Sequence, residues 1–217
     1  VKIAAHHAGI AVGPDGATHQ AVEDIATMRV MANMKVFVPC DHMEARKATE
    51  AAAKIWGPVY VRLAREKTPV ITTEETPFTP GKAEIFWESK KPEVAIIACG
   101  PLLYNAILAA HELGREGIGS VVVNNHSVKP IDEEGILGVA KRCGAVVTVE
   151  EHQIIGGLGS AVAETLAKHY PVPQEFIGVK DRFGESGNMG ELMKEFKLDT
   201  PAIIEAAKKV MGRKNKP

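Results

Sequence analysis

The densest group of side chains capable of acid–base chemistry lies near the start of the chain, in HHAGIAVGPDGATHQAVED. His6, His7, Asp15 and His19 fall within fourteen positions there. VGPDG predicts a turn, after which Thr18 is expected to cap a helix with His19 in its first turn. Free N–H groups at a helix N-terminus favour a phosphate, an oxyanion or a neutral imidazole that transfers protons near neutral pH. A capped helix beside a polar loop, without a function, is an equally good interpretation.

Two arginines, Arg62 and Arg65, end the strand-like run VYVRLAR. Ligands of α/β proteins bind at the carboxyl ends of strands, and a guanidinium can hold a phosphate through two parallel hydrogen bonds. A lone arginine at a strand end is more often part of a surface ion pair. The histidines and Asp15 lack the spacing of a zinc site, so no metal site is expected.

A second glycine-rich segment, EEHQIIGGLGSAVAE at 150–164, follows the run AVVTVE. Its glycines miss the third position of a dinucleotide-binding fingerprint, which favours a structural role in a tight turn into a helix. Nucleotide binding at 156–160 remains a minor alternative. Glu151 and His152 in this segment, and His126 after another strand, have no assigned role.

Apolar runs of strand length alternate along the chain with segments of helical periodicity. Continuous Val and Ile runs are typical of parallel strands buried on both faces, so an α/β protein is predicted. Asp41 and Glu44 form a capping box that predicts a helix reaching Ile55, and further helices are expected from Pro101 and Thr200. The expected strands lie at 1–5, 35–39, 59–64, 94–100, 120–125, 145–150 and 175–179.

Residues 67–92 interrupt this alternation with Thr, Glu, Pro and Gly and little periodicity, which indicates a linker. Residues 83–87 within it could form a short edge strand. The segment 93–212 is expected to be a complete doubly wound α/β domain, whereas 1–66 resembles the second half of such a domain. Residues 213–217 are expected to form a solvated tail.

The composition excludes several classes of function. The 217 residues carry a formal net charge of −1 and 5% aromatic residues, so no binding of nucleic acid is expected. The most apolar stretch, 94–110, is too short to span a bilayer, and no signal peptide is visible from Val1 onward. Cys40, Cys99 and Cys143 form an odd set without a CxxC pair, which predicts buried free thiols and a cytoplasmic location.

The segment HAGIAVGPDGATHQAVEDIATMRVMANMKVFVPCD resembles the pyrimidine-binding domain of the transketolase family, which carries a similar His…GxDGxTHQ…E stretch. GPVYVRLAR is similar to the strand that closes this domain. VAIIACGPLLYNAILAAHEL and VVTVEEHQIIGGLGSAV are similar to the family's C-terminal domain. The resemblance implies an incomplete parallel-sheet pyrimidine-binding domain at 1–66, the linker, and a complete doubly wound C-terminal α/β domain at 93–212.

Transketolases use thiamine diphosphate and Mg²⁺ to transfer a two-carbon unit from a ketose phosphate to an aldose phosphate. The resemblance implies that His7 and Arg65 bind the substrate phosphate and that Asp15 binds a substrate hydroxyl. It also implies that His19 lies near the aminopyrimidine and the reacting carbons, where it helps proton movement. No residue is assigned to the cofactor, whose ligands are expected upstream of Val1 or on a partner chain.

We therefore expect the C-terminal portion of a transketolase that is inactive alone and forms a homodimer or associates with an N-terminal transketolase segment or subunit. Ala8, Gly9 and Pro14 depart from the polar or acidic residues common at these positions, which leaves the substrate preference open. The alternatives are a portion of a related thiamine enzyme, namely a deoxyxylulose-phosphate synthase or a 2-oxoacid dehydrogenase β subunit, or a noncatalytic dimerisation module.

Overall fold

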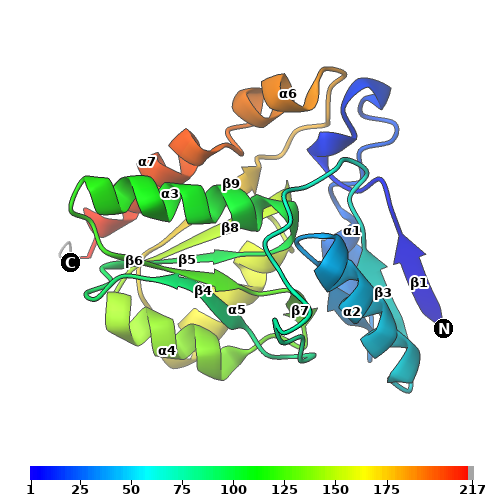
Figure 1. Cartoon of the computed structure of the whole chain (residues 1–217), viewed down its shortest axis with the longest axis horizontal. Helices are drawn as coiled ribbons and strands as arrows, with labels where there is room; N and C mark the ends of the chain where they lie inside the picture. The colour runs from blue at the N-terminus through cyan, green and yellow to red at the C-terminus, as the bar shows by residue number, and fades with distance from the viewer. Residues whose placement is uncertain (215–217) are drawn as a thin grey trace.

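The computed structural model describes residues 1–214 and contains two mostly parallel sheets flanked by helices (Figure 1). The strands are β1 (Lys2–Ala5), β2 (Lys35–Phe37), β3 (Val59–Arg62), β4 (Glu84–Glu88), β5 (Val94–Ala98), β6 (Ser120–Asn124), β7 (Ser127–Lys129), β8 (Val146–Gln153) and β9 (Gln174–Val179). The helices are η1 (Ile10–Asp15), α1 (Asp24–Val30), α2 (His42–Lys54), η2 (Gly100–Leu102), α3 (Leu103–Arg115), α4 (Glu133–Cys143), α5 (Leu158–His169), α6 (Met189–Glu195) and α7 (Thr200–Met211). The α/β class predicted from the alternating runs is confirmed.

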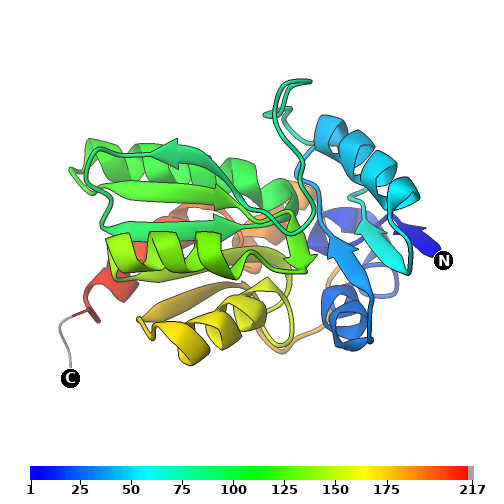
Figure 2. The ribbon, with the colours of Figure 1, turned by 90° about the horizontal axis from the view of Figure 1, so that it is seen from below.

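The first sheet has the strand order β1-β3-β2-β7, in which β7 runs antiparallel to β2. The helices α1 and α2 cover its opposite faces (Figure 2). Successive side chains of a strand point to opposite faces, so Val36 packs with Ile25 of α1, whereas Phe37 packs with Ala48 of α2. Because β7 comes from the chain after residue 92, the second half of the chain completes this sheet.

The second sheet has the order β4-β6-β5-β8-β9, with β4 antiparallel to β6 at one edge. Helices α3 and α7 lie on one face, and α4 and α5 lie on the other (Figure 1). Ile96 accordingly packs with Leu103 of α3, while its neighbour Ile97 packs with Ile136 of α4. Both faces of β5 are covered, which explains why its sequence is continuously apolar.

The start of α2 confirms the predicted capping box, with the Cys40 amide as the partner of the Glu44 carboxyl group. The Asp41 side chain accepts a hydrogen bond from the Glu44 amide at 2.9 Å, and the Glu44 carboxyl group accepts one from the Cys40 amide at 2.7 Å. Asp41 Oδ2 also accepts hydrogen bonds from the amides of Ile71 and Thr72, at 2.8 and 2.7 Å. One buried carboxylate therefore caps α2 and fixes the segment that leaves the first sheet.

The helix after VGPDG begins later than predicted, because α1 starts at Asp24. Thr18 does not cap it, since its hydroxyl lies 2.9 Å from Nδ1 of His19, and His19 lies in a turn upstream of the helix. The cause is a parallel bridge in which the Gly9 amide donates to the Ala21 carbonyl at 2.8 Å. This bridge keeps the chain extended where the sequence predicts the first helical turn.

The predicted state of the cysteines is confirmed, because Cys40, Cys99 and Cys143 are free and buried. None of the helices within residues 1–214 combines the length and the apolar character needed to cross a membrane. The expected tail at 213–217 lies largely outside the described residues.

Candidate functional site

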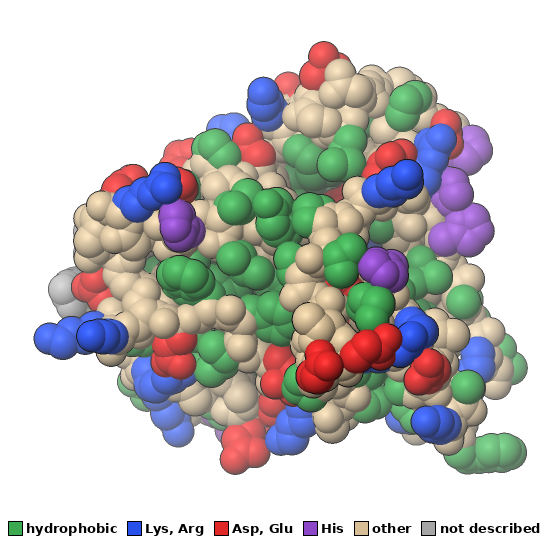
Figure 3. All heavy atoms as spheres, viewed as in Figure 1, with side chains coloured by type: hydrophobic (Ala, Val, Ile, Leu, Met, Phe, Trp, Pro, Cys, Tyr) green, Lys and Arg blue, Asp and Glu red, His purple; other side chains and the backbone are tan. Residues whose placement is uncertain are grey.

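Two loops meet at the carboxyl edge of the first sheet, because the strands that precede them, β1 and β3, are parallel neighbours. The Ala8 amide donates to the Leu63 carbonyl at 3.4 Å and joins these loops. Arg65 Nη1 donates to Asp15 Oδ2 at 2.9 Å and to the Val12 carbonyl at 2.7 Å. Histidine and charged side chains gather on the surface over the loops between β1 and α1 (Figure 3). The structure therefore brings Arg65 and Asp15 together.

The two histidines assigned to the site lie on the segment between β1 and α1, which also carries Asp15. His7 follows β1 with a left-handed backbone (φ 63°), and its ring Nδ1 contacts that of His6. His19 is exposed, and its amide donates to the Gly16 carbonyl at 3.0 Å. Within residues 1–214, neither His7 nor His19 forms a hydrogen bond with Arg65. Among the described contacts, the structure joins two of the four assigned side chains, Arg65 and Asp15.

Arg62 does not face a ligand, contrary to the expectation for a strand-end arginine. Its side chain is 4% exposed, and its Nε donates to Asp24 Oδ2 at 2.8 Å. Its Nη2 donates to the carbonyls of Ala21 and Glu151, each at 3.0 Å. Burial raises the pKa of Asp24, but the charge and the hydrogen bond of Arg62 outweigh it and leave this pKa below its ordinary value. Arg62 therefore fixes the start of α1 and the end of β8.

The glycine-rich segment before α5 receives an internal carboxyl group where a nucleotide-binding protein would place a phosphate. The Glu150 side chain accepts hydrogen bonds from the amides of Leu158 and Gly159, at 2.7 and 2.8 Å. A Cβ atom at Gly157 would lie 2.0 Å from Glu150 Oε2, so a larger residue there would displace this carboxyl group. Burial raises the pKa of Glu150 to about 7, although the two amides oppose this shift. These contacts favour the structural interpretation and oppose nucleotide binding.

His126 and His152, which the sequence left without an assigned role, are buried. The Ala26 amide donates to Nε2 of His152 at 3.3 Å, and burial lowers the pKa of this imidazole. His126 stacks on Phe78 with 4.1 Å between the ring centroids, and burial lowers its pKa to about 4. Both imidazoles are therefore neutral packing elements at physiological pH.

Two buried polar residues, Gln20 and Glu151, hold the η1 segment and were not assigned to the site from sequence. Gln20 Nε2 donates to the carbonyls of Ile10 and Glu185, at 3.1 and 2.9 Å. Glu151 Oε1 accepts a hydrogen bond from the Ala11 amide at 2.5 Å. Sequence could have indicated such residues, because a polar side chain in a buried segment needs a hydrogen-bond partner elsewhere in the protein.

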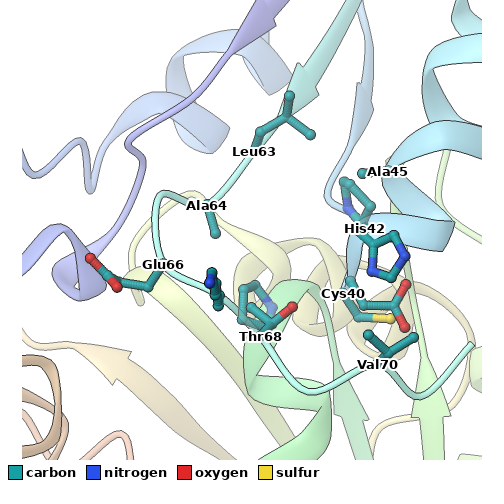
Figure 4. Close-up of a pocket in the computed structure, with 12 residues that line it drawn as sticks. Cys40, His42, Ala45, Leu63, Ala64, Glu66, Thr68 and Val70 are labelled. Atoms are coloured by element: carbon teal, nitrogen blue, oxygen red, sulfur yellow. The ribbon is translucent and has the colours of Figure 1, made fainter.

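A cavity of about 530 Å³ adjoins this edge, between the segment after β3 and the start of α2 (Figure 4). Cys40 and His42 line one side, and Ala64 and Glu66 line the other. Burial and the nearby carboxylates raise the pKa of the Cys40 thiol, so it is not a nucleophile at neutral pH. Arg65 is flanked in the sequence by the lining residues Ala64 and Glu66, but none of the four assigned side chains lines the cavity.

Both halves of the chain match the domains of one enzyme family. Residues 1–70 match the transketolase pyrimidine binding domain, and residues 81–203 match the transketolase C-terminal domain. The chain belongs to the transketolase family. The resemblance seen in the sequence is thereby confirmed over both transketolase domains.

Several transketolases are similar to the chain over nearly its whole length. The 6-deoxy-6-sulfo-D-fructose transketolase subunit SqwH of Clostridium sp. (strain MSTE9) is 43% identical over 215 residues, which are 99% of this chain and 66% of that subunit. An apulose-4-phosphate transketolase subunit of Phocaeicola vulgatus is 37% identical over 208 residues, which are 95% of this chain and 66% of that subunit.

A solved structure described as a split gene transketolase, in an inactive beta4 tetramer, superimposes with a TM-score of 0.92 at 45% identity. The match covers 99% of this chain and 68% of that chain. This transketolase chain therefore spans about two thirds of the length of the relatives it matches.

Proposed function

We propose that this chain is the C-terminal portion of a thiamine-diphosphate-dependent transketolase, which transfers a two-carbon ketol unit between sugar phosphates. The observation that supports it is the contact of Arg65 with Asp15, at the edge of a parallel sheet in a chain of this family. A guanidinium there offers a cation to a phosphate, and a carboxylate accepts hydrogen bonds from a sugar hydroxyl. The site therefore suits an anionic polyol.

Within this proposal, each side chain at the edge has a distinct part. Arg65 and His7 hold the terminal anionic group of the sugar, and Asp15 binds one of its hydroxyls. His19 is exposed on its turn and moves a proton at the reacting carbons, a role that suits an imidazole near neutral pH. The names of two relatives, for a sulfo sugar and a sugar phosphate, support the binding of an anionic sugar.

The described residues do not fit the Mg²⁺ ion that accompanies the cofactor. Across residues 1–214, no three His, Cys, Asp or Glu side chains lie together in a way that could hold a metal ion. Thiamine diphosphate supplies the chemistry that breaks and forms the carbon–carbon bond. We infer that another segment or subunit holds it, and that the chain alone is inactive.

Exposed apolar side chains support association with a partner. Val30 at the end of α1, Ile155 after β8 and Phe183 after β9 are 83%, 67% and 82% exposed. Exposed apolar surface of this kind marks interaction sites, and the solved relative is a tetramer. We infer a homodimer or a complex with an N-terminal transketolase subunit. We also infer a cytoplasmic location, which the three free thiols support.

An assay of the chain with and without an N-terminal transketolase subunit tests the proposal. We expect thiamine-dependent ketol transfer from the complex and none from the chain alone. In the complex, His19→Ala should lower kcat at least about 100-fold, the usual contribution of general acid–base catalysis. His111→Ala, at a half-exposed histidine of α3, is the matched control. Turnover by the chain alone, or equal effects of the two variants, would contradict the proposal.

A further inference from the structure

A carboxyl group of the second sheet reaches into the turn that follows β1. Glu151 lies in β8, is 4% exposed, and accepts the Ala11 hydrogen bond described above. Gly9 has a left-handed backbone (φ 91°), and a Cβ atom there would lie 2.3 Å from Glu151 Oε1. The turn therefore wraps closely around this carboxyl group, with a glycine at the point of closest approach.

The segment held by Glu151 connects residues assigned to the sugar. His7 lies just before Gly9, and η1 runs from Ile10 to Asp15. Arg65 holds the far part of η1 through Val12 and Asp15, at 2.7 and 2.9 Å. Glu151 holds the near part, so the segment is fixed at two points, one from each sheet.

Glu151 is itself fixed against the first sheet. Its backbone carbonyl accepts the hydrogen bond from Arg62, which is paired with Asp24. The Gln153 amide donates to the Val22 carbonyl at 2.8 Å, which docks the end of β8 beside the start of α1. Because Glu151 is held against the first sheet and also binds the Ala11 amide, it fixes the position of the turn relative to that sheet.

We propose that Glu151 is a positioning residue, whose carboxyl group holds the turn 9–15 so that His7 and Asp15 are set in place before the sugar binds. This inference rests on the proposed function for the identity of the sugar-binding residues. Glu151 is too buried to touch the sugar and acts through the Ala11 amide. The second sheet, which carries none of the assigned residues, thereby takes part in substrate binding.

Hydrogen exchange of the whole chain tests the positioning role without an activity assay. In Glu151→Leu, which lacks an acceptor, exchange of the 9–15 amides should accelerate at least about tenfold, because a buried N–H loses its partner. Glu151→Gln keeps an acceptor oxygen and should remain near the unmodified chain. Glu205→Leu, at an exposed position of α7, is the matched control. Equal exchange in all four proteins would overturn the proposal.

The unmodified chain offers a second measurement that does not depend on the folding of a variant. The Ala11 amide should exchange as slowly as the amides of β8, because it is held by a buried group. Exchange of Ala11 at the rate of exposed turn amides would also overturn the proposal.

In the complex with an N-terminal subunit, Glu151→Leu should raise KM for the ketose phosphate about tenfold, with kcat changed less and with rescue by Glu151→Gln. A merely structural role would reduce the amount of folded enzyme and leave KM unchanged, which would refute positioning. If the unmodified complex has no transketolase activity, the proposed function fails, whereas the exchange measurements still decide whether Glu151 holds the turn.

Discussion

Arg65 and Asp15 form an ion pair with 2.9 Å between Nη1 and Oδ2, although fifty positions separate them in the chain. Both side chains are about one third exposed, so the pair is open to an incoming ligand. An anion that binds Arg65 must share the guanidinium with a carboxylate that is already there. We therefore expect Asp15 to tune the affinity of Arg65 for anions, in addition to its proposed contact with the sugar.

Replacing Asp15 by Asn should strengthen the binding of inorganic phosphate about two- to fivefold, since a partly exposed pair contributes up to about 1 kcal/mol. Calorimetric titration of the chain measures it. Arg65→Ala should remove the binding, and Glu66→Gln, whose carboxylate lies 3.8 Å from Arg65 Nε, should have a smaller effect than Asp15→Asn. Weaker binding by Asp15→Asn would contradict this interpretation.

Replacing Arg62 by Met should lower the free energy of unfolding by about 3–5 kcal/mol, because it leaves the buried Asp24 carboxylate without its partner. Urea unfolding measures the loss, and adding Asp24→Asn should recover part of it. The control is Arg46→Met, in a pair whose side chains are 54% and 56% exposed, which should cost less than about 1 kcal/mol. Similar losses in both variants would rule out a special role for the buried pair.

Replacing Asp41 by Ala should cost about 2–4 kcal/mol, because the side chain caps α2 and also accepts hydrogen bonds from two amides of the following segment. Asp199→Ala is the matched control, since that side chain caps α7 alone and should cost about 1 kcal/mol. Urea unfolding compares the two. A smaller loss at Asp41 than at Asp199 would show that the additional hydrogen bonds contribute nothing.

The Asp41 effect should depend on pH in a defined direction. Burial raises the pKa of Asp41, but hydrogen bonds from Glu44 and Thr72 outweigh it and leave this pKa below its ordinary value. The stability that Asp41 contributes is therefore present above the unfolded-state pKa and is lost as the pH falls through the lower folded-state value. The difference in unfolding free energy between the unmodified chain and Asp41→Ala should shrink in acid.

Glu150 and Glu151 should give the opposite pH dependence. Burial raises the pKa of each to about 7 from an ordinary value of 4.5, so between these values the folded chain binds more protons than the unfolded chain. Rising pH therefore weakens folding in this window. For Glu151, burial and the Asp24 charge raise the pKa, whereas the Ala11 amide and Arg62 oppose the rise.

Glu151→Gln should remove part of this slope, as measured by urea unfolding at about pH 5 and about pH 7.5, which bracket the window. Glu205→Gln, at an exposed position, should leave the slope unchanged. A slope in Glu151→Gln equal to that of the unmodified chain would show that Glu151 does not titrate in this window.

The sheets are largely predictable from sequence, because their strands are buried on both faces. The run that contains Ile96 and Ile97 predicts β5 correctly, since neighbouring side chains enter different apolar clusters and both must be apolar. The cap of α2 is predictable for a similar reason, because Asp41 and Glu44 interact within one turn. Local interactions of this kind need no knowledge of the rest of the chain.

The late start of α1 depends on partners that no local pattern contains. The hydrogen bond between Gly9 and Ala21 keeps the chain extended after Thr18, and Gln20 is held by the carbonyl of Glu185, which is 165 positions away. The role of Arg62 is hidden for the same reason, because its partners belong to α1 and β8. Residue types alone place two equivalent arginines at the end of β3, and the family resemblance selects Arg65. The three-dimensional contacts add the reason that Arg62 is not available, because its side chain is buried against Asp24.

The hydrogen bond between Ala11 and Glu151 has a consequence for recombining sequences among relatives. A hybrid that joins residues 1–70 of one protein to residues 81–203 of another replaces one side of this bond independently of the other. Such a hybrid keeps the turn in place only if position 9 has a small residue and the side chain at position 151 is long enough to accept a hydrogen bond from the amide at position 11. Crossovers chosen by domain boundary alone should therefore yield folded chains in which the turn 9–15 is poorly formed.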